Sequence, residues 1–348
     1  MNEHDMDMES SADGACSEFA SLSRRGFLGS TAAVGATSIS QLAFGAGRGS
    51  DRANDVLIVI FLRGGMDGLT TVVPYGDADL YNARPTLAIN PPGQTDGALD
   101  LDGFFGLPPS CASLLPAFQQ GDLAFVHAAG STDPTRSHFT AMQRMETGTP
   151  NMGQTTISDG WIGRHLQTTP PMGAGELRAL AVQSILPRSM SGGPGAIPAK
   201  DPADFNFPGE PLLAGALRSV IETSYQRAAE PLKGAASSSF GAIDLLASVD
   251  FANYQPANGA TYPVGDFGAS LVSVAAMIKA DIGLECIEVD IPQWDHHAAM
   301  GPVDGTLAIK LADLSAGLNA LHKDLTAELG HVTIVVKSEF GRRVAENG

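Results

Sequence analysis

The chain has 348 residues, of which 43% are hydrophobic and only 17% are charged. This composition allows a sizeable buried core, and it excludes a coiled coil, a collagen-like chain and a charge-rich disordered chain. Lys and Arg number 21 against 38 Asp and Glu, which gives a formal net charge of −17. Because binding to a polyanion needs clustered Lys and Arg, we exclude nucleic acid and anionic membrane surfaces as partners.

The first segment predicts an export signal rather than a part of the fold. Residues 1–22 are polar and acidic, and the pair Arg24-Arg25 precedes a weakly apolar run over residues 27–46. A twin arginine ahead of such a run, with small residues at its end for cleavage, is typical of twin-arginine export. The run contains too much Gly, Ser and Thr for a transmembrane anchor, which needs about 20 strongly apolar residues. We therefore predict a periplasmic or secreted protein without stable membrane insertion, with residues 1–46 as its signal.

Two cysteines, Cys111 and Cys286, lie beyond the signal. Two cysteines in so long a chain do not make a disulfide framework. They either form one bridge or are two small buried residues. Because Cys286 lies inside an apolar, strand-like run, we favour two buried free thiols.

Residues 47–348 predict a single α/β domain in which strands and helices alternate. Short apolar runs predict strands, namely at 55–62, 123–127, 178–183, 285–291 and 331–337. Helices are expected at 110–120, 137–146 and 267–281, and from Leu307 onward, where apolar residues recur every three or four positions. This order predicts a doubly wound, mostly parallel sheet with helices on both faces.

The middle of the chain is poor in strand patterns. Residues 184–210 are rich in Pro and Gly and predict a loop. Helices are predicted at 211–231 and 240–250. Together these segments predict a helical cap inserted around residues 184–262.

The first two predicted strands are followed by polar candidate residues. Asp67 stands in a Gly-rich turn, where a carboxylate either holds a cation or bonds to backbone amides. The glycine spacing fits neither a dinucleotide loop nor a P-loop. Ser137 is either a helix N-cap or a nucleophile at a helix N-terminus. Arg136 and His138 flank Ser137, where they would clamp or protonate an anionic ligand.

The last two predicted strands are followed by candidate metal ligands. Asp295, His296 and His297 are adjacent, and imidazoles beside a carboxylate suit a divalent metal, although a polar surface loop has the same pattern. Glu339 either belongs to this site or pairs with a neighbouring arginine. Because function collects at the carboxyl ends of strands in such a sheet, we expect the candidates to meet in one place. The expected group is Asp67, Ser137, Asp295, His297 and Glu339.

These motifs together resemble the exported bacterial domain-of-unknown-function family 1501, over about residues 55–348. The landmarks occur in order and include Leu62-Arg63-Gly64-Gly65, Ser137-His138-Phe139, Gly160-Trp161-Ile162-Gly163-Arg164, Trp294-Asp295 with His297, and Ser338-Glu339-Phe340-Gly341-Arg342. That family is grouped with the alkaline phosphatase and sulfatase superfamily. The resemblance therefore implies an alkaline phosphatase-like fold and a two-metal ester hydrolase layout.

The resemblance also implies roles for individual residues. Asp67 would hold one metal and Ser137 would be the nucleophile. Asp295 and His297 would hold the other metal, and Glu339 would complete the bridge. The metals expected are zinc, calcium or magnesium. The substrate expected is a small-molecule or polymer ester, with phosphate favoured over sulfate because no Cys occupies the nucleophile position.

Two departures from that pattern keep alternatives open. Phe340 stands where the superfamily usually has a His ligand, and Asp295-His296-His297 replaces the family's usual Asp-Thr-His, so either imidazole is a candidate ligand. A non-catalytic exported protein with a decayed site would bind a metal, a surface polymer or a partner. An assembly factor for an exported partner is the third class.

The end of the sequence carries a further expectation. Residues 338–348 are polar and loop-like, so the strand before them lacks a covering helix. The family typically continues with an Asp-His-Gly segment that supplies another His. We therefore expect this sequence to be a fragment of a longer protein, with apolar sheet surface left exposed.

Overall fold

The computed structural model describes most of the chain beyond the predicted signal. The described residues are 55–149, 157–171, 175–209, 211–298 and 300–346. All of them belong to the unit formed by Gly47–Gly348, and the predicted export signal lies outside them. None of the described helices is long and apolar enough to cross a membrane.

A five-stranded sheet lies at the centre of this unit, with strand order β5-β4-β6-β1-β7 and every neighbouring pair parallel. The strands are β1 (Val56–Leu62), β4 (Ala179–Ala181), β5 (Ala196–Pro198), β6 (Cys286–Ile291) and β7 (Val332–Ser338). The continuous apolar run of β1 suits a strand that is covered on both faces. The predicted α/β class with a parallel sheet is therefore confirmed.

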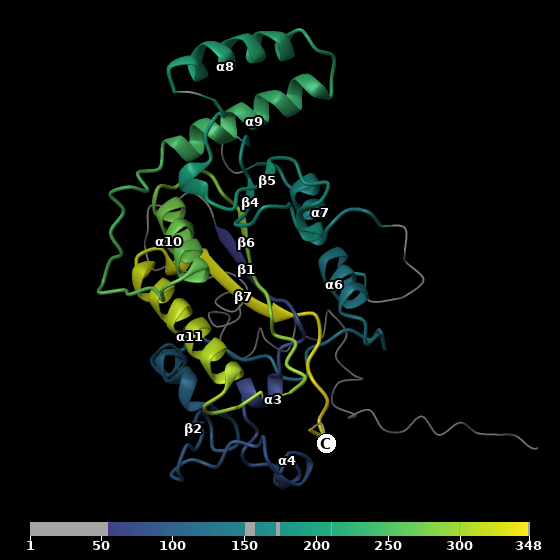
Figure 1. The fold of residues 1–348 in the computed structure, drawn as a ribbon, viewed down its shortest axis with the longest axis vertical. Coiled ribbons are helices and arrows are strands. Elements are labelled where there is room, and N and C mark those ends of the chain that lie inside the picture. The colour runs from purple at the N-terminus through teal and green to yellow at the C-terminus, as the bar shows by residue number, and fades with distance from the viewer. Residues whose placement is uncertain (1–54, 150–156, 172–174, 210, 299, 347–348) are drawn as a thin grey trace, which may run out of the picture. The chain divides into compact units, whose positions relative to one another are not determined.

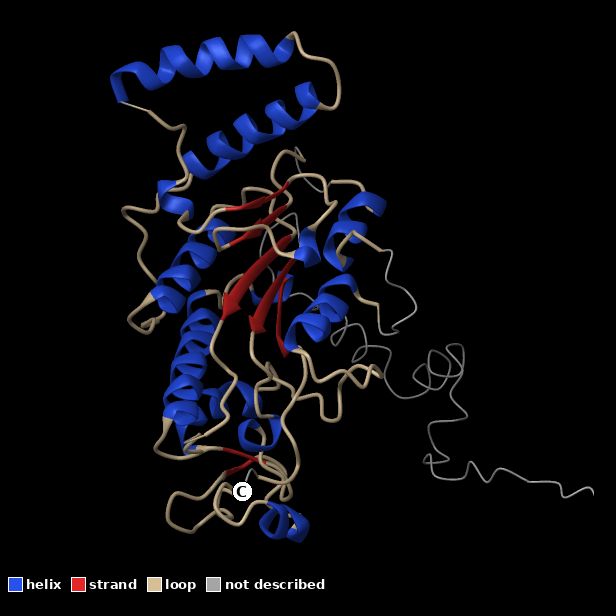
Figure 2. Ribbon diagram, turned by 45° about the vertical axis from the view of Figure 1, so that its right-hand side comes forward, coloured by secondary structure: helices blue, strands red, loops and turns tan. Residues whose placement is uncertain are grey.

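Helices cover both faces of the sheet (Figure 1, Figure 2). On one face, α10 (Asp266–Lys279) and α11 (Thr306–Asp324) enclose the larger apolar core. Helix α11 buries Leu307, Leu311 and Leu314, which belong to the stripe that its sequence pattern predicts.

The opposite face carries α6 (His138–Thr147) and α7 (Trp161–Thr168) (Figure 1). Ile162 and Leu166 of α7 pack there with Val59 of β1 in a smaller apolar core. The sheet therefore separates two cores of unequal size.

The remaining elements surround this layered body. A small antiparallel sheet of β2 (Leu99–Asp100) and β3 (Gly106–Leu107) lies near α3 and α4 (Figure 1). Helices α8 and α9 form a hairpin in the region predicted to be a cap, and α8 packs on α9. The other bounds are α3 (Gly68–Thr71), α4 (Ala78–Ala83), η2 (Pro109–Leu114), α5 (Leu115–Gln119), η3 (Arg188–Met190), η4 (Pro202–Asp204), α8 (Pro211–Gln226), α9 (Leu232–Ala247) and η5 (Leu329–His331).

The strand predicted at residues 123–127 is wrong. Leu123 and Phe125 pack against the core, while Val126 is 82% exposed, and the segment joins no sheet. Its alternating pattern reflects one-sided burial of an extended segment without a neighbouring strand. The polar residues around Ser137 therefore do not follow a strand.

The loop predicted at residues 184–210 contains β5. This strand pairs with β4 along Ala179–Ala181 and ends at Pro198. A proline is tolerated there because β5 lies at the edge of the sheet, where one side of the strand needs no ladder hydrogen bonds.

Strand β7 lies at the other edge of the sheet and, within the described part of the chain, pairs with β1 alone. Val335 and Val336 of β7 are 41% and 36% exposed, whereas Val59 and Ile60 of β1 are fully buried. The described residues therefore leave apolar surface of β7 open to solvent.

Cys111 and Cys286 are free and buried, as predicted. Burial raises the pKa of each thiol to about 12. Both thiols are therefore protonated at neutral pH and act as small core side chains.

Candidate functional site

Three neighbouring strands end at the same level, so the loops that follow them lie together at the carboxyl end of the sheet. The register pairs Leu62 of β1 with Ile291 of β6 and with Ser338 of β7, so the three strands end side by side. The loops after β6 and β7 carry Asp295 and Glu339. The predicted convergence of these two loops is therefore seen in the structure.

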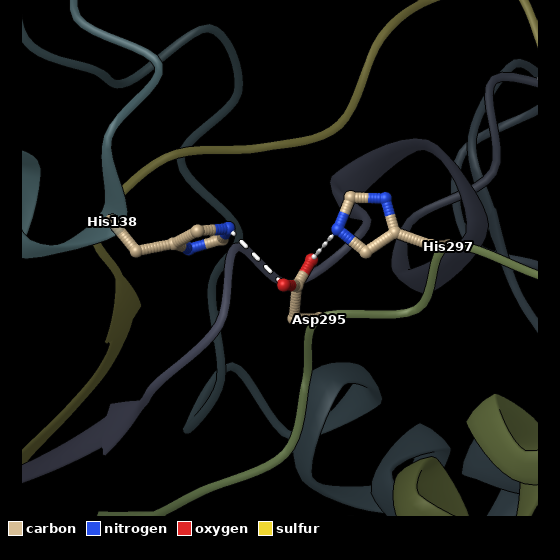
Figure 3. A group of neighbouring side chains, drawn as sticks. All are labelled: His138, Asp295 and His297. Atoms are coloured by element: carbon tan, nitrogen blue, oxygen red, sulfur yellow. Dashed lines mark ion pairs between the residues drawn. The ribbon is translucent and has the colours of Figure 1, made fainter.

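His138, Asp295 and His297 form the centre of the site and are called the triad below (Figure 3). One ligand atom from each residue lies within 4.8 Å of the others. Nε2 of His297 lies 2.8 Å from Oδ1 of Asp295, and Nε2 of His138 lies 3.4 Å from Oδ2. Two imidazole nitrogens and a carboxylate oxygen are a donor set that Zn²⁺ uses in proteins.

Glu339 holds His138 from the side opposite Asp295. Its side chain is fully buried, and its Oε1 lies 2.7 Å from Nδ1 of His138. The same carboxylate accepts the N–H of Gly64 at 2.9 Å. A proton on Nδ1, donated to Glu339, leaves a lone pair on Nε2 that points toward Asp295. Metal-ligating histidines are commonly oriented by a carboxylate in this way.

The Gly-rich turn after β1 allows close packing at the site. A Cβ on Gly64 would lie 2.5 Å from the backbone nitrogen of Asp295, and one on Gly65 would lie 2.6 Å from the Phe340 ring. Their φ angles of 126° and 69° also favour glycine. The turn therefore lets the loops after β6 and β7 pack closely against it.

Phe340 packs its ring against His138, with centroids 4.7 Å apart. The position where a further His ligand is expected therefore supports the imidazole of the triad by an apolar contact.

Asp67 lies outside the triad. Its Oδ2 accepts Nη1 of Arg84 at 2.6 Å, and its Oδ1 caps α3 by accepting the N–H of Leu69 at 3.1 Å. Both side chains of the ion pair are almost fully buried. In this arrangement a buried arginine and a helix cap occupy both oxygens of the expected metal ligand.

Ser137 is the N-cap of α6, and its Oγ accepts the N–H of Thr140 at 3.4 Å. Ser137 and Arg136 are both exposed. They directly precede His138 in the chain but are not part of the triad.

Arg342 supplies a positive charge at the triad. Its Nη1 donates to Oδ1 of Asp295 at 2.7 Å, and its Nη2 donates to the carbonyl of His296 at 3.0 Å. Burial acts to raise the pKa of Asp295, but the hydrogen bond from Arg342 and the nearby imidazoles outweigh it and lower that pKa. The carboxylate is therefore ionised at neutral pH, as a metal ligand must be.

The structure distinguishes between the two adjacent histidines. Nδ1 of His296 lies 3.0 Å from the carbonyl oxygen of Trp294, and burial lowers the pKa of this imidazole. Only His297 belongs to the triad. The other imidazole of the triad, His138, is predicted from sequence as a clamp or proton donor and not as a ligand.

A second charged group lies on the α6 side of the sheet and is called the buried cluster below. It comprises Arg63, Glu146, Glu288, Asp290 and Lys337. Arg63 lies 2.5 Å from Asp290 and 2.7 Å from Glu146. Lys337 interacts with Glu288 and Asp290 and lies over the ring of Phe61. The sequence signal for this cluster is the presence of charged residues within and directly after otherwise apolar strands.

Glu288 is the most enclosed member of the buried cluster. Its side chain is fully buried, one oxygen is bonded to the Ser189 hydroxyl, and Oε1 has no hydrogen-bond partner among the described residues. Burial is the main cause that raises the pKa of Glu288 to about 7. This carboxyl group is therefore partly protonated near neutral pH.

Comparison with known proteins gives one match. A family described as "Protein of unknown function (DUF1501)" matches residues 54–348. No curated protein matches the chain, and no solved structure matches it. The geometry of the site therefore has to carry any functional argument.

Proposed function

The chain belongs to the DUF1501 family, and from this premise and the site geometry we propose that it binds one divalent cation through His138, Asp295 and His297. The observation that carries the proposal is the orientation of His138. The carboxylate of Glu339 is hydrogen-bonded to Nδ1 of this ring, while Nε2 faces the carboxylate of Asp295. A buried carboxylate behind a histidine is the usual support of a metal ligand.

Zn²⁺ fits this donor set best among the metals expected from the sequence. Two imidazoles and one carboxylate match the ligands of zinc sites, whereas Ca²⁺ and Mg²⁺ prefer oxygen ligands throughout. The described residues contain one group with suitable distances. We therefore propose a single cation rather than a pair.

Zinc content tests this proposal directly. Purified protein is exposed to Zn²⁺, desalted and analysed by mass spectrometry, and about one zinc per chain is expected. His297→Ala should lose most of this zinc. His296→Ala is the matched control, since it removes the adjacent imidazole that lies outside the triad. Equal loss in both variants, or no zinc in the unmodified protein, would contradict the proposal.

Ester hydrolysis is a second candidate function, favoured by the position of Ser137. This serine lies at the N-terminus of α6, directly before His138. A bound cation would supply positive charge to stabilise the oxyanions of a phosphate ester during displacement. The zinc-loaded protein should then turn over an aryl phosphate monoester, and Ser137→Ala should abolish this activity. A zinc-loaded protein without turnover would be a non-catalytic metal-binding protein.

We also propose export through the twin-arginine signal, on the basis of Arg24 and Arg25. Replacing both residues with Lys should retain the protein in the cytoplasm, because the export receptor reads the arginine pair. Cell fractionation measures the outcome. An unchanged periplasmic yield would contradict this export route.

A further inference from the structure

Arg342 binds the carboxylate of Asp295, which is the same group that would bind the proposed metal. Its Nη1 donates to Oδ1 of Asp295 at 2.7 Å, the same oxygen that lies 2.8 Å from Nε2 of His297. Its Nη2 lies 3.5 Å from Nδ1 of His297. The guanidinium therefore stands in for part of the positive charge that a cation would bring to the triad.

The contacts of Arg342 leave part of its binding capacity unused. Among the described residues they involve Nη1 and Nη2, whereas a guanidinium has five N–H donors in a planar fork. The side chain is 16% exposed, so the residue lies near the surface and is not sealed in the core. A planar fork of this kind matches the oxygens of phosphate and carboxylate groups.

The charges of the site change sign when a cation binds. Asp295, Glu339 and Arg342 together carry one net negative charge, and a divalent cation makes the sum positive by one unit. The cation also binds the carboxylate that accepts hydrogen bonds from Arg342, and its charge repels the guanidinium. Both effects favour an anion next to the metal, and both weaken the ion pair between Asp295 and Arg342.

We propose that Arg342 binds an oxyanion, of the phosphate or phosphonate class, once a divalent cation has taken the carboxylate of Asp295. The cation and the oxyanion then bind cooperatively, since each favours the arrangement in which Arg342 has left Asp295. Such coupling is reciprocal: the oxyanion must raise the affinity for the metal by the factor by which the metal raises the affinity for the oxyanion. This inference rests on the proposed zinc site.

A purely structural role for Arg342 makes a different prediction. If the residue only joined the loop after β7 to the loop after β6, its removal would weaken zinc binding equally with and without an oxyanion. Zinc affinity measured under both conditions therefore separates the two roles.

The test uses Zn²⁺ and methylphosphonate, a soluble oxyanion that cannot be hydrolysed as an ester. Zinc affinity is measured by competition with a chelator, with and without methylphosphonate. In the unmodified protein the oxyanion should raise zinc affinity about 10-fold, within the usual range of coupling between sites. Arg342→Ala should bind zinc at least as tightly without the oxyanion and should show no rise.

Two further variants complete the design. Arg343→Ala removes the same charge from the next residue, whose exposed side chain donates to the carbonyl of Glu346 at 3.2 Å, and it should behave as the unmodified protein. Arg342→Lys keeps the charge without the fork, so it should retain a smaller rise. This variant also serves as the test if Arg342→Ala does not fold.

The outcomes separate this inference from the zinc proposal. Zinc binding in the unmodified protein without any effect of methylphosphonate would overturn the role of Arg342 alone. A full rise in Arg342→Ala, or the loss of the rise in Arg343→Ala, would overturn it as well. An unmodified protein that binds no zinc would overturn both proposals.

Discussion

The triad and the buried cluster combine acidic and basic side chains beside the same three strands, but they differ in their access to water. Side-chain exposure in the triad is 25% for His138, 39% for Asp295 and 71% for His297. In the buried cluster it is 0% for Glu288 and 16% for Asp290.

This difference determines how each group is neutralised. The buried cluster has three carboxylates and obtains two cations, Arg63 and Lys337, from the chain itself. Its remaining negative charge is reduced by a proton, because burial raises the pKa of Glu288 to about 7. The triad is paired with Arg342, and its side chains are open to a cation from solution. The two groups therefore differ in how much of their charge is balanced by the chain itself.

The largest expected effect is on the free energy of unfolding, when the arginine that pairs with the carboxylates of each group is removed. Arg63→Ala should lower the free energy of unfolding by about 3–5 kcal/mol, because it leaves buried carboxylates without their partner. Arg342→Ala removes the same charge from Asp295, whose side chain is 39% exposed and can be solvated by water, and should cost less than about 1 kcal/mol. Urea denaturation of both variants measures the difference. Similar losses would show that burial does not separate the two groups.

The pH dependence of stability isolates the role of Glu288. Its pKa is about 7 in the folded protein and about 4.5 when unfolded, so the folded state binds more protons between these values. Stability should therefore fall as pH rises from about 4.5 to 7, by roughly 2–3 kcal/mol from this residue.

Glu288→Gln should remove this loss, because a neutral amide needs no proton. The groups that face Glu288 are Ser189, Arg63, Asp290 and Lys337, and all of them remain in the variant. The free energy of unfolding is measured at pH 5 and pH 8 in both proteins. A variant with the same pH dependence as the unmodified protein would assign the effect to another group.

The smallest expected effect comes from making one substitution at each group. Glu339→Gln should weaken zinc binding about 10-fold, because it removes the charge that supports His138. Glu288→Gln is the matched control in the buried cluster and should leave zinc affinity unchanged. Chelator competition measures both. Equal effects would show that the two groups are coupled through the sheet.

The central strands could be predicted from the sequence, and so could part of the site. A strand covered on both faces needs apolar residues throughout, so β1 is visible as a continuous apolar run. Strands β6 and β7 are visible as mostly apolar runs that include charged residues. Parallel strands that end side by side bring their loops together, which explains why Asp295 and Glu339 lie in neighbouring loops. Residues 123–127 show the limit of this reasoning, since an apolar pattern reports burial but not the presence of a partner strand.

The roles of single side chains depend on partners that the sequence does not specify. Nothing near Asp67 indicates that Arg84 will occupy its carboxylate inside the core. His138 is a candidate ligand because Glu339 holds its other nitrogen, and these residues are 201 positions apart in the chain. Such pairings arise from the three-dimensional arrangement of the chain and not from its local sequence.

The position of β1 at the centre of the sheet has a consequence for the time course of folding. The hydroxyl of Ser338, at the end of β7, bonds to the carbonyl of Leu62, at the end of β1, across 276 residues of sequence. At typical synthesis rates of 5–20 residues per second, the ribosome needs on the order of 10–60 s to add that much chain. Until then the apolar residues of β1 lack the neighbour on one side, and contacts of such long range also form slowly. The apolar run of β1 is therefore left without this neighbour during most of synthesis, a period in which it favours aggregation of the nascent chain.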